Sequence, residues 1–227
     1  LLRQLGMSWT ATLLSVGAFA STGFYWVYGH VMFDLGPILI LAACVAYLRT
    51  ATQPTRAVVA ATALSALLAT LASWPGIAFA GALIAWLFVA RRDQAATIVA
   101  AAGGVGLLIS LGFMVGVHGV GVLADQTEFR TNGGTFTVEQ FGRQIMRYLR
   151  NLLPDWYRVL LVPATIAGLV DRRTRTLTAV AAVFAAGWIV VLNNGAYIHD
   201  YWSYLVVLPG LIGGAALVDR VAGWLTR

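Results

Sequence analysis

Long apolar stretches with almost no charged residues recur along this chain, and they restrict its fold more than any other feature. The hydrocarbon core of a bilayer is about 30 Å thick, so a helix needs about 20 apolar residues to cross it, with a range of about 17–25. Eight stretches of roughly that length alternate with polar connections. We predict a transmembrane helix in each, at residues 8–28, 32–48, 57–73, 76–90, 95–117, 156–170, 176–192 and 201–218. The fourth and sixth are short, and a re-entrant helix buried by protein is the alternative there.

The composition excludes several other classes of protein. Of the 227 residues, 59% are hydrophobic and only 11% are charged, whereas a soluble domain carries roughly 25% charged residues. A water-soluble chain of this length could not bury so much apolar surface and still cover itself with polar groups. We therefore exclude a water-soluble enzyme, a disordered chain and a disulfide scaffold. The expected fold is an all-α, polytopic integral membrane protein with about eight transmembrane helices.

The arginines predict how the chain is oriented. All 15 basic residues are Arg, and the membrane side richer in basic residues is the cytoplasmic one. With eight spans, ten Arg fall on one side and five on the other, all five in or beside the long connection 118–155. Both ends of the chain should then be cytoplasmic, and this connection should lie outside. The abundance of Arg, Ala and Gly, whose codons are GC-rich, indicates a bacterial source. The expected location of the chain is the inner (plasma) membrane, which it would cross several times.

Two further expectations concern the partners of the chain and the longer protein to which it belongs. The arginines form short clusters between apolar stretches rather than one basic face, so nucleic acid is not an expected partner. The chain starts at Leu1 with no initiator Met and no signal peptide. We expect it to be the C-terminal portion of a longer protein, in which residues 1–227 form a single transmembrane domain.

The outer connection 118–155 contains a predicted amphipathic helix at residues 137–152. Thr137 and Gln140 have the spacing of a capping box, and apolar residues then recur at helical spacing. This stripe consists of Val138, Phe141, Ile145, Leu149 and Leu152, and the opposite face carries Arg143, Arg147 and Arg150. The helix could lie on the membrane surface with a solvated basic face. Alternatively, some of its arginines, together with Arg130, could hold an anionic group such as a lipid phosphate, which suits the forked donors of Arg.

Histidines and acids gather on the predicted outer side. His30, His118 and His199 all fall there, as do Asp34 and Asp200. Asp34 opens the second span, where it could complement the helix dipole or line a polar site. The aromatic residues after Asp200 suit an interfacial belt, but a belt does not explain the adjacent His199–Asp200 pair.

Known catalytic and metal motifs are missing from the sequence. The three histidines lack metal-ligand spacing, so we expect no metal site and no other cofactor. The pairs Gly112/Gly116 and Gly210/Gly214 are expected to pack helices.

Three segments resemble one family. They are Leu5-Gly6 through a hydrophobic span to Tyr28–Asp34, the hairpin 57–90 returning to Arg91-Arg92, and His199-Asp200-Tyr201-Trp202 followed by Leu208-Pro209-Gly210. Together they resemble the bacterial branch of the GT-C membrane glycosyltransferases, the group related to protein O-mannosyltransferases and lipid A aminoarabinose transferases. That family often carries a Lys near the helix hairpin, which this chain lacks.

The resemblance implies a function and roles for residues. Family members transfer a sugar from a polyprenyl-phosphate carrier to a glycan, lipid or protein acceptor on the outer face, with membrane lipids around them. Their catalytic Asp lies in a first outward loop, which by this likeness falls upstream of Leu1, so Asp34 would only support catalysis. The donor phosphate would meet Arg130, Arg143, Arg147, His199 and Tyr201, while the acceptor side would be lined by His30, Asp200 and Trp202. The alternative is a transporter or flippase subunit that binds a lipid-linked sugar without chemistry.

Overall fold

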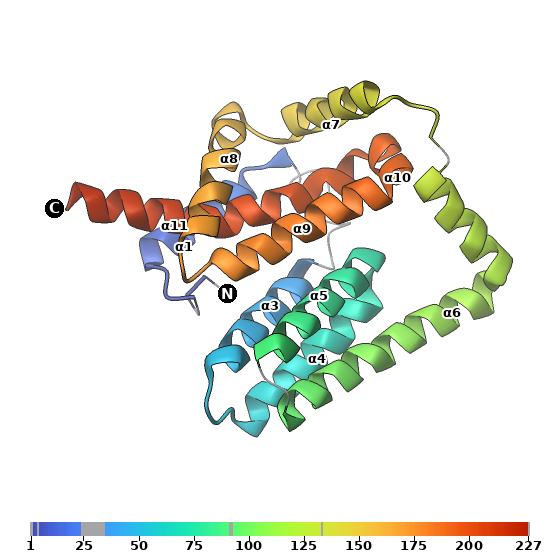
Figure 1. The fold of residues 1–227 in the computed structure, drawn as a ribbon, viewed down its shortest axis with the longest axis horizontal. Helices are drawn as coiled ribbons and strands as arrows, with labels where there is room; N and C mark the ends of the chain where they lie inside the picture. Colours follow the sequence, from blue (N-terminus) through green and yellow to red (C-terminus); the bar gives the residue numbers. More distant parts are fainter. Residues whose placement is uncertain (1, 4, 24–34, 91–92, 133, 227) are drawn as a thin grey trace. The chain divides into compact units, whose positions relative to one another are not determined.

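The computed structural model describes residues 2–3, 5–23, 35–90, 93–132 and 134–226. All regular elements in this part of the chain are helices, and it contains no strand, so the all-α expectation is confirmed for it (Figure 1). The chain divides into two compact units. Of the described residues, the first comprises 35–90 and 93–124, and the second comprises 2–3, 5–23, 125–132 and 134–226. Whether the two make up one transmembrane domain stays a prediction.

The first unit contains three packed helices and the start of a fourth. These are α3 (Leu35–Thr50), α4 (Arg56–Ala72), α5 (Trp74–Ala90) and the N-terminal part of α6 (Gln94–Asn132). Helices α3, α4 and α5 pack against one another, and their core includes Leu41, Leu83 and Leu87, which are fully buried. Helix α6 is joined to α4 by a hydrogen bond of 2.9 Å from the Ser110 hydroxyl to the backbone oxygen of Thr70.

The hairpin between α4 and α5 is tighter than the sequence suggests. The predicted spans 57–73 and 76–90 leave residues 74 and 75 as the turn between them, but Trp74 already begins α5. The reason is Ser73, which ends α4 in an extended conformation and accepts a hydrogen bond of 2.9 Å from the backbone N–H of Gly76. Pro75 fits the first turn because it has no N–H to satisfy there.

Helix α6 is much longer than its predicted span. The predicted span ends at residue 117, where the outer connection begins, but the helix continues to Asn132 after a kink at Gly119. Gly119 has φ +79°, a left-handed conformation that glycine adopts without steric cost. The helix is apolar, yet in its most apolar stretch of 18 residues only 17% is buried. Leu108, for example, is 71% exposed. A helix that is apolar all round is typical of a protein core or a membrane span.

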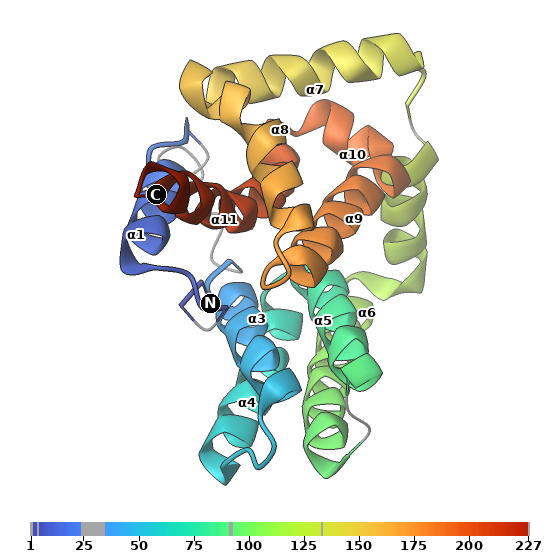
Figure 2. The ribbon, with the colours of Figure 1, turned by 60° about the vertical axis from the view of Figure 1, so that its left-hand side comes forward.

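The second unit is organised around its last helix, α11 (Val207–Leu225). Helix α11 packs against α1 (Trp9–Ala20), α8 (Asp155–Val170) and α9 (Arg175–Val191), as Figure 2 shows. The α8–α11 crossing is a backbone-to-backbone contact. A Cβ on Gly213 would lie 2.0 Å from the backbone oxygen of Ala164, so no larger residue fits there.

The expected glycine pairs behave differently from each other. Gly210 faces the side chain of Leu161 in α8, and Gly214 faces Ser15 in α1, so this pair does pack helices. The expectation for Gly112 and Gly116 is not met among the described residues, since a Cβ on either would have no neighbour within 4 Å.

A polar cluster fastens one end of the second unit. The Arg173 guanidinium pairs with Asp171 (3.0 Å) and with Asp219 of α11 (3.4 Å). Asp219 also accepts hydrogen bonds from the backbone N–H (3.2 Å) and the hydroxyl (2.6 Å) of Ser8, the N-cap of α1. Thr174 donates to the backbone oxygen of Gly168 at 2.9 Å. These bonds join the start of α1, the α8–α9 turn and the end of α11.

The helices lie at the predicted spans, but several of them are short for a membrane crossing. Two described helical segments, Gln94–Asn132 and Trp202–Leu225, are long and apolar enough to cross a membrane. Five shorter apolar helices have at most 17 residues, or about 26 Å at about 1.5 Å per residue, against about 30 Å of hydrocarbon. Helix α1, for example, ends at Ala20, within its predicted span of 8–28. Eight membrane crossings therefore stay a prediction.

Candidate functional site

An indole ring forms the centre of the candidate site in the second unit. Trp202 lies in the 3₁₀ helix η1 (Asp200–Val206). The guanidinium carbon of Arg130 is 5.8 Å from the centre of the Trp202 ring, and the His199 ring is 6.0 Å away. Trp188 of α9 contacts the same indole, with ring centres 5.5 Å apart. The resemblance assigned Arg130 and His199 to the donor phosphate and Trp202 to the acceptor side, and the structure brings the three side chains together.

The short helix α10 (Asn193–Ile198) sets the position of Trp202. A Cβ on Gly195 would lie 2.2 Å from the Cζ3 atom of Trp202, so the ring packs directly on the backbone of α10. Any side chain at this position would push the indole away. The contact therefore requires glycine at residue 195.

Asn194 sets the position of Arg130. Its buried amide donates a hydrogen bond of 2.7 Å to the backbone oxygen of Phe129, the residue before Arg130. The bond joins α10 to the end of α6, which lie 65 residues apart in sequence. Because it satisfies a backbone carbonyl at a helix end, it also stabilises the last turn of α6.

The surroundings of His199 favour its neutral form. Burial of the ring lowers the pKa of His199 below its ordinary value, and the nearby positive charge of Arg130 lowers it further, while Asp200 acts in the opposite direction. At neutral pH the imidazole is therefore uncharged, with one nitrogen that donates and one that accepts a hydrogen bond.

Helix α7 (Val138–Leu152) supports the site from beside α10 and η1. Its predicted capping box is confirmed, since the Thr137 and Gln140 side chains each bond to the other's backbone N–H. The hydroxyl of Tyr148 donates a hydrogen bond of 2.6 Å to the backbone oxygen of Tyr197 in α10. Helix α7 is therefore held to the element that carries Asn194 and Gly195.

The apolar stripe of α7 is only partly covered. Leu149 and Leu152 are buried by protein, whereas Val138 at the other end of the helix is 91% exposed. The basic face is exposed as well. Arg143 pairs with Glu139 one turn away at 2.7 Å, and the Arg147 side chain is exposed.

The remaining predicted residues fall in different places. His30 and Asp34 lie outside the described residues, as does the side chain of Tyr201, whose backbone belongs to η1. Asp200 is close enough to His199 to affect its pKa. His118 lies on α6 just before the kink and is exposed.

Sequence reasoning missed three residues of the site, namely Trp188, Asn194 and Gly195. A signal for two of them was present, because Asn193-Asn194-Gly195 is a polar interruption between two apolar stretches, and amide and glycine residues favour turns and irregular backbone. No local sequence signal identifies Trp188 as a site residue. It lies within an apolar helix, and it contacts Trp202 only when α9 and η1 have packed together.

The arrangement suits the binding of an anion next to a flat apolar group. Arg130 supplies a permanent positive charge, neutral His199 supplies one further donor, and Trp202 supplies an aromatic face. Among the described residues, no group of three or more His, Cys, Asp or Glu side chains could hold a metal ion. Comparison of the chain with protein-family models, with curated proteins and with solved structures finds no match.

Proposed function

We propose that this chain forms part of a membrane glycosyltransferase, which transfers a sugar from a polyprenyl-phosphate donor to a glycan, lipid or protein acceptor. The observation that carries the proposal is the grouping of Arg130, His199 and Trp202 at the ends of apolar helices. Such a position suits a ligand whose charged head lies at a membrane surface while its tail lies in hydrocarbon.

The proposed role of the site is to bind the donor phosphate. Arg makes two parallel hydrogen bonds to phosphate oxygens, and such charge-assisted bonds are stronger than neutral ones. Neutral His199 adds a donor, and Trp202 holds the Arg130 guanidinium by a cation–π contact. These groups would also stabilise the charge that develops on phosphate as the glycosidic bond breaks.

The proposal gives the other predicted residues supporting roles. Phosphate is already a good leaving group, so the reaction needs mainly a base that takes the proton of the acceptor hydroxyl. Asp34 would orient the acceptor. Arg143, Arg147 and Tyr201 are proposed as further phosphate contacts, and His30, Asp200 and Trp202 as the lining of the acceptor side.

The proposed setting is the inner (plasma) membrane of a bacterium, crossed several times. The two helical segments long enough to span a bilayer support membrane association. The distribution of Arg supports a site that faces outward and chain ends that face the cytoplasm.

Donor kinetics of the complete gene product, purified in detergent, test the proposal. Arg130→Ala and His199→Ala should each raise KM for the polyprenyl-phosphate sugar, since a lost hydrogen bond to a charged group costs about 1.5–3 kcal/mol, or roughly 10- to 150-fold. Asp34→Asn should lower kcat. Arg56→Ala is the matched control, because Arg56 is an exposed residue at the start of α4 on the predicted cytoplasmic side.

Two results would contradict the proposal. One is an unchanged KM for both Arg130→Ala and His199→Ala at equal amounts of folded protein. The other is a wild-type protein that binds the lipid-linked sugar but transfers none to any acceptor, which would favour the transporter or flippase alternative.

A further inference from the structure

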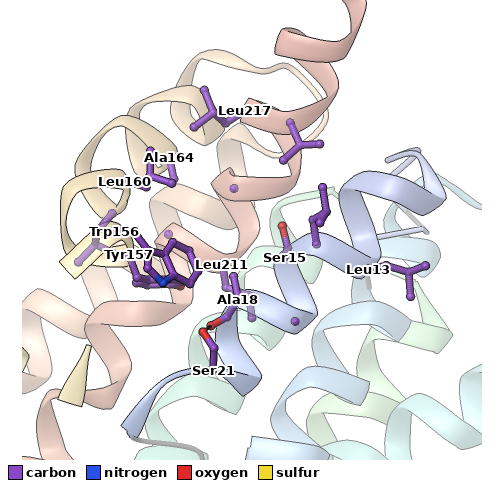
Figure 3. Close-up of a pocket in the computed structure, with 16 residues that line it drawn as sticks. Leu13, Ser15, Ala18, Ser21, Trp156, Tyr157, Leu160, Ala164, Leu211 and Leu217 are labelled. Carbon is purple, nitrogen blue, oxygen red and sulfur yellow. Dashed lines mark hydrogen bonds between the residues drawn. The ribbon is translucent and has the colours of Figure 1, made fainter. Parts of the chain in front are cut away.

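A second candidate ligand site lies in the second unit, in an apolar pocket between α1, α8 and α11 (Figure 3). Its volume is about 400 Å³, within the range of about 300–1,000 Å³ typical of small-molecule sites. Leucines from all three helices line it, including Leu13 of α1, Leu160 of α8 and Leu217 of α11. A pocket of this character suits a hydrocarbon chain.

Small residues create the space. Gly17 and Ala18 line the pocket from α1, and Ala164, Gly210 and Gly214 line it from α8 and α11. A Cβ placed on Gly17 would meet no atom within 4 Å. The pocket at this point is therefore open and could be filled by a larger side chain without moving the backbone.

The pocket wall also contains two hydroxyl groups that lack a partner. Ser15 is 5% exposed and Tyr157 is 6% exposed, and both residues line the pocket. Within the described part of the chain, neither hydroxyl oxygen has a hydrogen-bond partner. Buried hydroxyls are normally satisfied, and leaving one unpaired is destabilising. A purely hydrocarbon ligand would leave the Tyr157 hydroxyl unpaired.

The directions of the helices place Tyr157 toward one end of the pocket and Ser15 nearer its middle. Helix α1 is antiparallel to α11, since Ser8 bonds to Asp219 and Ser15 faces Gly214. Tyr157 lies in the first turn of α8, which runs parallel to α11 because Leu161 faces Gly210 and Ala164 faces Gly213.

The two ends of the pocket consequently differ in character. Trp156, Tyr157 and Ser21 mark one end, and Leu13 and Leu217 mark the other. Tyr and Trp are typical of the level at which acyl chains meet head groups.

We propose that this pocket binds a membrane glycerophospholipid. One acyl chain lies along the leucines toward Leu13 and Leu217, and its ester carbonyl accepts a hydrogen bond from the Tyr157 hydroxyl. The ester is what distinguishes this ligand from an isoprenoid tail, which has no oxygen between its phosphate and its far end. The site requires a membrane setting but does not depend on sugar transfer.

Native mass spectrometry of the complete protein in dodecyl maltoside tests the site. The probes are dioleoyl phosphatidylglycerol, its dialkyl ether analogue without ester carbonyls, and undecaprenyl phosphate. Gly17→Leu fills the pocket, and Tyr157→Phe removes only the hydroxyl. Gly187→Leu in α9 is the matched control, because a Cβ there also has no neighbour within 4 Å and Gly187 does not line the pocket.

The expected result is a phospholipid adduct that Gly17→Leu weakens at least about tenfold and Gly187→Leu leaves unchanged. Tyr157→Phe should weaken it about two- to tenfold, the range of one neutral hydrogen bond. The ether analogue should bind equally to wild type and Tyr157→Phe, because neither combination can form the bond. The proposal is overturned if Gly17→Leu binds phosphatidylglycerol like wild type, if wild type binds ester and ether lipids alike, or if undecaprenyl phosphate displaces phosphatidylglycerol at equal concentration.

Discussion

Asn194 and Phe129 are joined by a hydrogen bond of 2.7 Å from the buried side-chain amide of one to the backbone oxygen of the other. The bond crosses 65 residues of sequence, and it links the short helix that supports Trp202 to the helix end that carries Arg130. The geometry of the candidate site therefore depends on a residue that need not touch a ligand.

Replacement of Asn194 by Ala should destabilise the protein and weaken donor binding together. Loss of the amide leaves the Phe129 carbonyl without this partner, which typically costs about 1–3 kcal/mol. Thermal unfolding and donor KM check the two effects. Asn193→Ala, one residue earlier, is the control and should change neither by a comparable amount; equal effects of the two substitutions would contradict a specific role for Asn194.

Gly213→Ala should be strongly destabilising although it adds a single methyl group. Its Cβ would lie 2.0 Å from the Ala164 oxygen, so α8 and α11 must separate, and overpacking of this kind typically costs about 1–3 kcal/mol. Gly223→Ala lies in the same helix with no atom within 4 Å of the new Cβ. It should be neutral or stabilising, by up to about 1 kcal/mol, because Ala favours helix over Gly. Denaturant unfolding in detergent measures both, and similar midpoints would argue against this helix crossing.

The Asp171–Arg173 pair predicts a loss of stability in acid. The hydrogen bond from Arg173 is the largest influence on Asp171 and holds the pKa of its carboxyl below the ordinary value of 3.8. A carboxylate with a lowered pKa in the folded state contributes stability above its unfolded pKa, and this contribution is lost as pH falls through the folded pKa. The fall in unfolding temperature between pH 6 and pH 3 should therefore be smaller in Asp171→Asn than in wild type. Asp155→Asn is the control: its carboxylate pairs with Arg158 but is 91% exposed, so solvent screens the pair and the fall should change little.

Cysteine labelling should place the two ends of the second unit on opposite sides of the membrane. After Cys44 is replaced by Ala, a membrane-impermeant reagent should label Thr135→Cys in intact cells and Thr176→Cys only in opened membranes. Both positions are exposed, and the same residue type is replaced in each. The buried Thr174 is unsuitable because its hydroxyl bonds to the Gly168 carbonyl. The opposite labelling pattern would reverse the orientation inferred from the arginines.

The sequence predicted the structural features that depend on residues close together in the chain. Helix α7 is the clearest case, since Thr137, Gln140 and the apolar stripe all lie within 16 residues and their interactions are local. The positions of most other helices followed from the lengths of the apolar stretches. Their exact ends did not, because a single side chain such as Ser73 can move a helix start by two residues.

The assembly of the site could not be predicted in the same way. Arg130, Trp188 and Trp202 come from α6, α9 and η1, and their contacts exist only after these elements have packed. The sequence assigned Arg143, on a basic helix face, to the donor phosphate along with Arg130, and the structure adds that the Arg143 guanidinium pairs with Glu139 one turn away. Charge pattern alone did not distinguish it from Arg130, which lies against an aromatic ring.

The kink at Gly119 determines how far α6 can reach. As one straight rod, its 39 residues would extend about 58 Å at about 1.5 Å per residue, nearly twice the thickness of a hydrocarbon layer of about 30 Å. The part before the kink, residues 94–118, is about 38 Å long by the same measure, which is enough to cross the layer once. On the predicted crossing by residues 94–118, Gly119 falls where the helix would emerge into the head groups. The left-handed backbone at Gly119 interrupts the helix there, so the turns that carry Arg130 are not bound to continue along the same axis into water.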